Sequence, residues 1–101
     1  MLREEHNAWI HAVISIAVCV AGFWLELSRL EWCWIVLAMM AVWTAEGMNT
    51  ALESLANAVS TEPHPSVRRA KDAAAGAVLI AAVGAVIIGL LVLGPHLWTR
   101  L

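Results

Sequence analysis

The chain has 101 residues, of which 61% are hydrophobic and only 14% are charged, and its formal net charge is -2. A soluble domain is about half apolar and about a quarter charged, so this composition excludes an ordinary soluble domain and indicates a membrane protein. The negative net charge, without a large basic cluster, also excludes a typical nucleic-acid-binding domain.

The first apolar segment covers about residues 10–25. It is short for a membrane-spanning helix, because a hydrocarbon core of ~30 Å needs about 20 helical residues. A helix that begins near Arg3 would be long enough, and it would place Glu5 and His11 at its interface end. Residues 26–31 then form an expected tight, charged turn.

The second apolar segment covers about residues 32–59 and carries carboxylates at membrane depth. A charged side chain there costs roughly 2.5–3.5 kcal/mol on insertion scales, which makes Glu46 a functional candidate. At ~100° per residue, Glu46, Asn49 and Glu53 lie within an arc of about 60°. The sequence therefore predicts an acidic stripe on one helix face, which Asn57 extends toward one membrane surface.

A polar loop with two prolines leads to the third segment, and Ser66 or the residue before it is expected to start the third helix. This segment carries no charge from Ala73 through Gly94, a length sufficient to cross a membrane, and Pro95 follows. Small residues recur there at every fourth position, a pattern that suits either packing within the chain or a subunit interface.

Basic residues predict the orientation in the membrane. Three spans would place the N-terminus and the second loop on one side, which carries four basic residues against two on the other. The excess predicts that the N-terminus lies in the cytoplasm. The four are Arg3, Arg68, Arg69 and Lys71, and the two are Arg29 and Arg100.

The polar side chains on the predicted cytoplasmic side could support phosphoryl transfer. Carboxylates, amides and a lysine are groups that hold Mg²⁺ and phosphate oxygens, and the reaction further needs a base or orienting group for the attacking hydroxyl. At the depth of Glu46 that hydroxyl would belong to a lipid. The set comprises Glu5, Asn7, His11, Glu46, Asn49, Glu53, Asn57, His64, Arg68, Arg69, Lys71 and Asp72.

Simpler interpretations stand beside this one. A protonated Glu46 could be a structural hydrogen-bonding group between helices, and Lys71 alone could serve only as a topology determinant. His11 and His64 are expected to ligate no metal, because no Cys/His cluster accompanies them.

A different class of function also fits the acidic stripe. A small non-enzymatic oligomer could conduct protons or ions along Glu46, Asn49 and Glu53, because intramembrane acids mark ion pathways as well. Such a pore needs neither Glu5 nor the Lys71–Asp72 pair, whereas phosphoryl transfer needs a metal site and a phosphate clamp.

Two longer motifs resemble the prokaryotic diacylglycerol kinase family. Residues 46–53, Glu-Gly-Met-Asn-Thr-Ala-Leu-Glu, are similar to the family's Glu-x-x-Asn-Ser/Thr-Ala-Ile/Leu-Glu. Residues 70–79, Ala-Lys-Asp-Ala-Ala-Ala-Gly-Ala-Val-Leu, are similar to its Ala-Lys-Asp-x-x-Ala-Gly-Ala-Val-Leu. Residues 5–11, 28–32 and 64–65 resemble the undecaprenol kinase branch in particular.

This resemblance implies an all-α integral membrane protein, a helical-bundle homotrimer with three transmembrane helices per protomer and active sites between subunits. Residues 1–101 would form a single membrane-embedded lipid kinase domain in the bacterial inner (cell) membrane. The expected reaction transfers the γ-phosphate of ATP, with Mg²⁺, to the hydroxyl of undecaprenol or diacylglycerol. Most of the amphipathic surface helix that relatives carry before the position of Glu5 is expected to be absent.

The resemblance also implies roles for the acidic and amide residues. Glu46 matches the catalytic base, and Asn49 matches an asparagine of the active-site cluster. Glu5 and Glu53 match the Mg²⁺-binding glutamates. Asn57 supports the active site where relatives usually have Asp, which removes one negative charge near the metal.

The nucleotide site is expected to differ from a P-loop, because the chain contains no Gly-x-x-x-x-Gly-Lys-Ser/Thr sequence. The resemblance places Lys71 on the ATP phosphates instead. Asp72 and His64 are assigned to the same nucleotide site.

Overall fold

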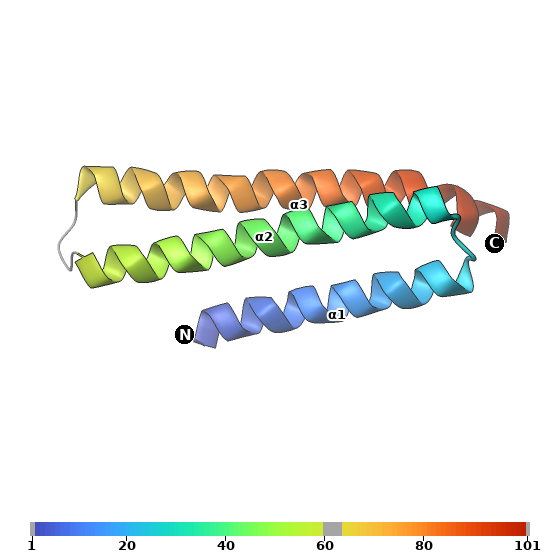
Figure 1. The fold of residues 1–101 in the computed structure, drawn as a ribbon, viewed down its shortest axis with the longest axis horizontal. Coiled ribbons are helices and arrows are strands. Elements are labelled where there is room, and N and C mark those ends of the chain that lie inside the picture. The colour runs from blue at the N-terminus through green and yellow to red at the C-terminus, as the bar shows by residue number, and fades with distance from the viewer. Residues whose placement is uncertain (1, 60–63, 101) are drawn as a thin grey trace.

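The computed structural model consists of three α-helices and describes residues 2–59 and 64–100, with side chains from Trp9 onward. Helix α1 spans Leu2–Trp24, α2 spans Arg29–Val59 and α3 spans Pro65–Arg100. The helices alternate in direction along one long axis (Figure 1), and the chain measures 55 × 22 × 21 Å. The all-helical class and the expected start of the third helix are confirmed.

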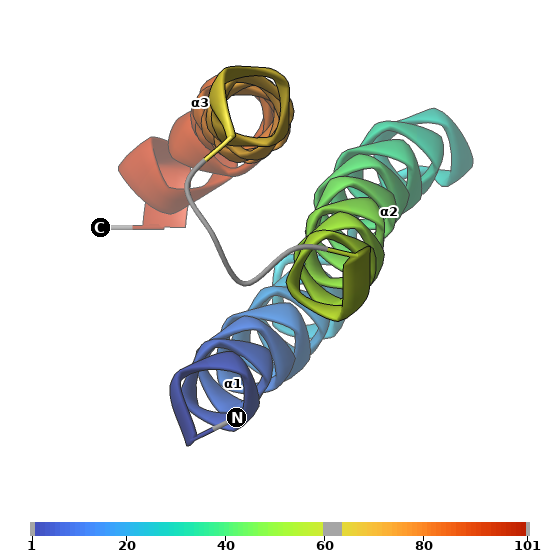
Figure 2. The ribbon, with the colours of Figure 1, turned by 90° about the vertical axis from the view of Figure 1, so that its left-hand side faces the viewer.

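Helix α2 is the central element. The view along the long axis shows α1 and α3 on two different sides of α2 (Figure 2). The pairing of α2 with α3 is far more extensive than that of α1 with α2. Helix α1 is therefore attached to the rest of the chain chiefly through a few specific contacts with α2.

Among the described residues, α2 and α3 are long and apolar enough to cross a membrane, whereas the apolar part of α1, Trp9–Trp24, is shorter. Only 11% of the most apolar window of α2, and 6% of that of α3, is buried within the chain. The core helix of a soluble protein would be mostly buried, so these surfaces face lipid or other protein copies. A third span in α1 stays a prediction.

The connection between α1 and α2 is shorter than the sequence predicts, because α2 already begins at Arg29 rather than near residue 32. A capping box explains this early start. The Ser28 hydroxyl accepts a hydrogen bond from the backbone N–H of Glu31 (3.1 Å), and the Glu31 carboxylate accepts one from the backbone N–H of Ser28 (2.9 Å). Glu26 makes the turn in a left-handed conformation, with φ of 57°.

Helix α3 does not end at Pro95 but continues to Arg100. Its last turns leave the straight course of the helix in Figure 1, as expected where a proline removes a backbone N–H and its ring displaces the preceding turn. His96 Nε2 lies 2.7 Å from Glu31 Oε2 on α2, and the Arg100 guanidinium lies 5.3 Å from the centre of the Trp24 ring on α1. These contacts hold the three helices together at this end.

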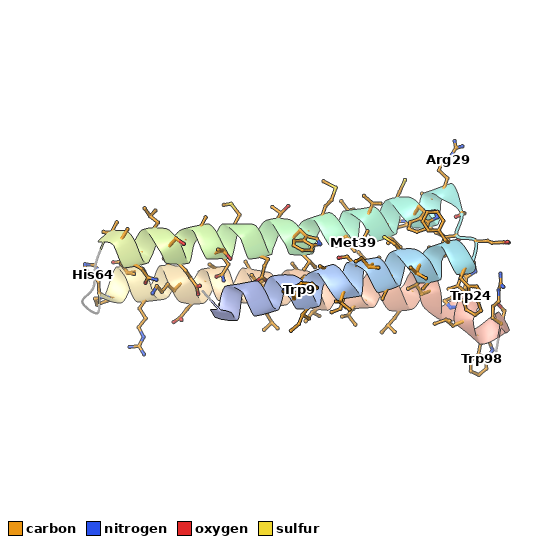
Figure 3. The ribbon with its side chains drawn as sticks, turned by 90° about the horizontal axis from the view of Figure 1, so that it is seen from below. Trp9, Trp24, Arg29, Met39, His64 and Trp98 are labelled. Carbon is orange, nitrogen blue, oxygen red and sulfur yellow. The ribbon has the colours of Figure 1, made fainter. Side chains whose placement is uncertain are left out.

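The two ends of the molecule differ in character. Figure 3 shows Trp24, Arg29 and Trp98 at one end and His64 at the other. Trp24 and Trp98 are 57% and 85% exposed, which suits aromatic anchors at a membrane interface.

Gly22 permits the closest approach of α1 to the start of α2. A Cβ at this position would lie 2.6 Å from a ring carbon of Trp32, and the same ring packs against Phe23 with centroids 5.0 Å apart. We expect Gly22→Ala to lower the free energy of unfolding by about 1–3 kcal/mol, the usual cost of overpacking. Thermal unfolding in detergent measures this as a lower midpoint.

Gly84→Ala is the matched control, because nothing lies within 4 Å of a Cβ built on Gly84. Alanine stabilises a helix interior by roughly 0.5–1 kcal/mol relative to glycine, so this variant should unfold at or above the wild-type midpoint. Equal midpoints for the two variants would contradict the close approach at Gly22.

Candidate active site

The predicted polar stripe lies on one face of α2 in the structure. Glu46, Asn49 and Glu53 are each partly buried, whereas Gly47 and Met48 between them are exposed. The helix is unbroken over this stretch, so its rise of ~1.5 Å per residue places Glu46 about 10 Å from Glu53 along the axis. Glu46 lies near the middle of the membrane-length helix, and the stripe runs from there toward the α2–α3 loop.

Lys71 joins this stripe from α3. Its Nζ donates a hydrogen bond to Asn57 Oδ1 at 3.1 Å, which brings two predicted site residues together across the α2–α3 interface. Asp72, the next residue, is exposed at the same end of the molecule. A cation thus lies one helical turn, about 6 Å, beyond the level of Glu53.

His64 has a structural role at the start of α3. Its Nδ1 accepts a hydrogen bond from the backbone N–H of Ser66 (3.2 Å). Its carbonyl oxygen accepts a hydrogen bond from the backbone N–H of Arg68 (2.9 Å). His64 is therefore the N-cap of α3, and Pro65 occupies the first helical position, where its missing N–H is not needed.

Glu46 has a partner that the sequence analysis did not assign. His11 was expected at the interface end of its helix, but its Nε2 lies 3.3 Å from Glu46 Oε2. The two side chains are only 23% and 17% exposed. The His11 ring also packs against Trp43, with centroids 5.9 Å apart, and Trp43 Nε1 donates a hydrogen bond to Ser15 Oγ at 3.1 Å.

A sequence signal for this cluster exists. His11 and Ser15 are four residues apart, so they share one face of an otherwise apolar helix segment. Trp43 and Glu46 are three residues apart and share a face of α2 in the same way. Two polar faces of this kind predict a contact between helices, although they do not reveal which residues meet.

The oxygen donors near Glu53 fit a magnesium ion, which prefers carboxylate, carbonyl and phosphate oxygens. Asn49 Oδ1 is buried and has no hydrogen-bond partner among the described residues. The side chain of Glu5 lies outside the described part.

The described side chains alone do not complete a metal site. Within residues 9–59 and 64–100, no three His, Cys, Asp or Glu side chains come together in a way that could hold a metal ion. Additional ligands would have to come from Glu5, from the nucleotide or from a second copy of the chain.

An apolar cavity of about 210 Å³ lies in the angle between the three helices, on the side of Glu46 away from the α2–α3 loop. His11, Ser15 and Trp43 are the lining residues with polar atoms, and Ala85 and Gly89 are among its wall residues on α3. The apolar side chains that line the cavity suit an alkyl chain. The cavity therefore places an apolar space next to His11, the residue that contacts Glu46.

Known proteins match most of the chain. A sequence profile described as prokaryotic diacylglycerol kinase matches residues 1–93. The undecaprenol kinase of Bacillus subtilis (strain 168) is 43% identical over 95 residues, which are 94% of this chain and 77% of that protein. The diacylglycerol kinase of Escherichia coli (strain K12) is 31% identical over 96 residues, which are 88% of this chain and 79% of that protein.

A longer relative is the diacylglycerol kinase of Synechocystis sp. (strain ATCC 27184 / PCC 6803 / Kazusa). It is 39% identical over 94 residues, which are 92% of this chain but 54% of that protein. These relatives are kinases by name and give no support to an ion-conducting bundle. The chain belongs to the prokaryotic diacylglycerol kinase family and is a membrane-bound lipid kinase.

Proposed function

We propose that this lipid kinase transfers the γ-phosphate of ATP, with Mg²⁺, to the hydroxyl of undecaprenol or diacylglycerol. The order of the polar groups along α2 is the observation that carries the proposal. Lys71 meets Asn57 near the loop, Glu53 follows one turn deeper, and Glu46 lies near the middle of the helix. This row of polar groups runs from the loop, where a water-soluble nucleotide can bind, to membrane depth, where the hydroxyl of a membrane lipid can lie.

Lys71 binds the phosphates of ATP. An ammonium group has three donors, of which one reaches Asn57 Oδ1, so two remain for phosphate oxygens. Asp72 and His64 contact the nucleotide at the same end. His64 uses Nδ1 for the helix cap, so Nε2 is the ring atom that would meet a ligand.

Glu53 and Glu5 hold the Mg²⁺ ion, with the Asn49 amide oxygen beside them. When bound there, Mg²⁺ would supply neutralisation of charge on the phosphate oxygens. The support for this assignment is the set of hard oxygen donors that Asn49 and Glu53 contribute on one face of α2. Asn57, where the family usually has Asp, keeps the lysine in place with one negative charge fewer.

Glu46 is the general base. Its carboxylate takes the proton of the lipid hydroxyl while the hydroxyl oxygen forms a bond to the γ-phosphorus. The bond from that phosphorus to the bridging oxygen breaks, and ADP leaves with the electron pair. The apolar cavity next to His11 accepts the first part of the lipid chain.

The assembly is a homotrimer in the bacterial inner membrane, with three spans and one domain per protomer, a cytoplasmic N-terminus and sites shared between subunits. Large apolar surfaces on α2 and α3 are exposed in one copy, which a second copy can cover. The small residues at every fourth position of α3 permit close approach of another helix. The excess of basic residues on the loop side supports the orientation.

Replacement of the base is the sharpest test of this function. Glu46→Gln keeps the size of the side chain but cannot accept the proton, so kcat should fall by about 10²–10⁴-fold while ATP binding changes little. The assay follows radiolabelled phosphate from ATP into undecaprenol and diacylglycerol, offered side by side in mixed micelles. Transfer to neither lipid by the wild-type protein would contradict the proposed substrates.

Glu26→Gln is the control, because Glu26 is an exposed carboxylate in the turn at the opposite end of α2. It should retain wild-type kcat. If Glu46→Gln also phosphorylates lipid at a near wild-type rate, Glu46 is a structural hydrogen-bonding group rather than the base.

A metal ligand should respond differently from a base. We expect Glu53→Gln to raise the Mg²⁺ concentration needed for half-maximal activity and to weaken ATP binding with it, since the metal and the phosphates bind together. Excess Mg²⁺ should restore part of the rate. A loss of kcat that no Mg²⁺ concentration relieves would argue against metal binding at Glu53.

Sharing of sites between subunits predicts complementation. Glu46→Gln and Lys71→Ala subunits, each nearly inactive alone, should regain measurable activity when mixed and reassembled, because some sites then combine intact residues from different chains. Reassembled samples of each variant alone are the control. The absence of any recovery would place each complete site within one chain.

A further inference from the structure

The contact between His11 and Glu46 joins ionisable side chains of α1 and α2 at membrane depth. From His11 Nε2 and Glu46 Oε2, 3.3 Å apart, we infer that His11 is a positioning residue for the base. It engages one carboxylate oxygen and leaves the other, Oε1, to take the proton of the lipid hydroxyl. The inference rests on the proposed function of Glu46.

His11 is itself held in place by neighbours. Its ring packs against Trp43, and the Trp43 indole is fixed by its hydrogen bond to Ser15. Ser15 and His11 lie one turn apart on α1, and Trp43 and Glu46 lie about one turn apart on α2. These four side chains form two neighbouring contacts between α1 and α2, Ser15–Trp43 and His11–Glu46. The His11 imidazole therefore cannot move to another rotamer without losing its packing against Trp43.

No other charged side chain in the described structure can replace His11. Helix α3 is uncharged between Asp72 and His96, so it offers Glu46 no cation at this level. Lys71 contacts Asn57, which is eleven residues and about 16 Å further along α2. A ring N–H is a donor that a carboxylate can accept, in the protonated ring or in the neutral tautomer with its proton on Nε2.

Positioning lowers the barrier because a free glutamate samples several side-chain rotamers, of which few present an oxygen to the reacting hydroxyl. A fixed carboxylate has lost this freedom before the substrate arrives. The contribution should therefore appear in kcat and leave the binding of ATP unchanged.

Two replacements of His11 separate its nitrogen from its ring. His11→Phe keeps a ring against Trp43 but has no donor, and kcat should fall about 10- to 100-fold, as for loss of a contact to a charged group. His11→Gln has a terminal N–H that can reach the carboxylate and should recover most of that loss. Cys19→Ala, two turns further along α1, is the control and should keep wild-type kcat.

The double variant decides whether His11 acts through Glu46. In the Glu46→Gln background, His11→Phe should cause less than about a twofold further loss, because residues that act as one unit are not additive. Losses that multiply would assign His11 to another step and overturn the inference. So would a His11→Phe enzyme with wild-type kcat, or a His11→Gln enzyme as slow as His11→Phe.

Failure of the inference and failure of the proposed function give different results. A near wild-type Glu46→Gln enzyme refutes the base, whereas an inactive Glu46→Gln enzyme with a fully active His11→Phe enzyme refutes only the positioning role. A measurement without catalysis covers the case in which His11→Phe does not fold. In protein with ¹⁵N-labelled histidine, Glu46→Gln should shift the Nε2 signal that His11→Gln removes, and an unchanged signal would overturn the contact.

Discussion

The cost of a carboxylate in the middle of an apolar helix governs the organisation of this enzyme. Glu46 lies near the midpoint of α2, and more than four-fifths of its side chain is shielded by the chain itself. An unpartnered charge at that depth is expensive, so the neighbouring helix must bring a polar group to it. Helix α1 does so with His11, and this requirement fixes the register of a helix that otherwise packs sparsely against α2.

Much of the architecture follows from local sequence signals. Helical periodicity alone predicts that Glu46, Asn49 and Glu53 share one face of α2. The start of α3 at Pro65, directly after its N-cap, also agrees with the sequence. The early start of α2 was missed because charged residues were interpreted as a turn, although Ser28 and Glu31 form a capping box. The continuation of α3 past Pro95 is accompanied by a contact, His96 to Glu31, that no local pattern reveals.

The site could be predicted only as far as single helices allow. Which residues share a face follows from the sequence, but which faces meet depends on the relative shift of two helices. The partner of Glu46 was missed for this reason, because His11 comes level with it only after α1 and α2 are aligned. Close packing at the other end, where Gly22 admits the Trp32 ring, adds to the same alignment.

Two polar contacts between α2 and α3 have a consequence for the spacing of the candidate site residues. His96 with Glu31 fixes one end of the pair, and Lys71 with Asn57 fixes the other. A shift of one residue between the helices would break both contacts. The contacts therefore fix the register of α3 against α2. The separation of the lysine from the deep carboxylate, about 16 Å of helix, is thereby a constant of the fold. His96, at the far end of the molecule, thus helps to keep the spacing of these two side chains within one chain constant.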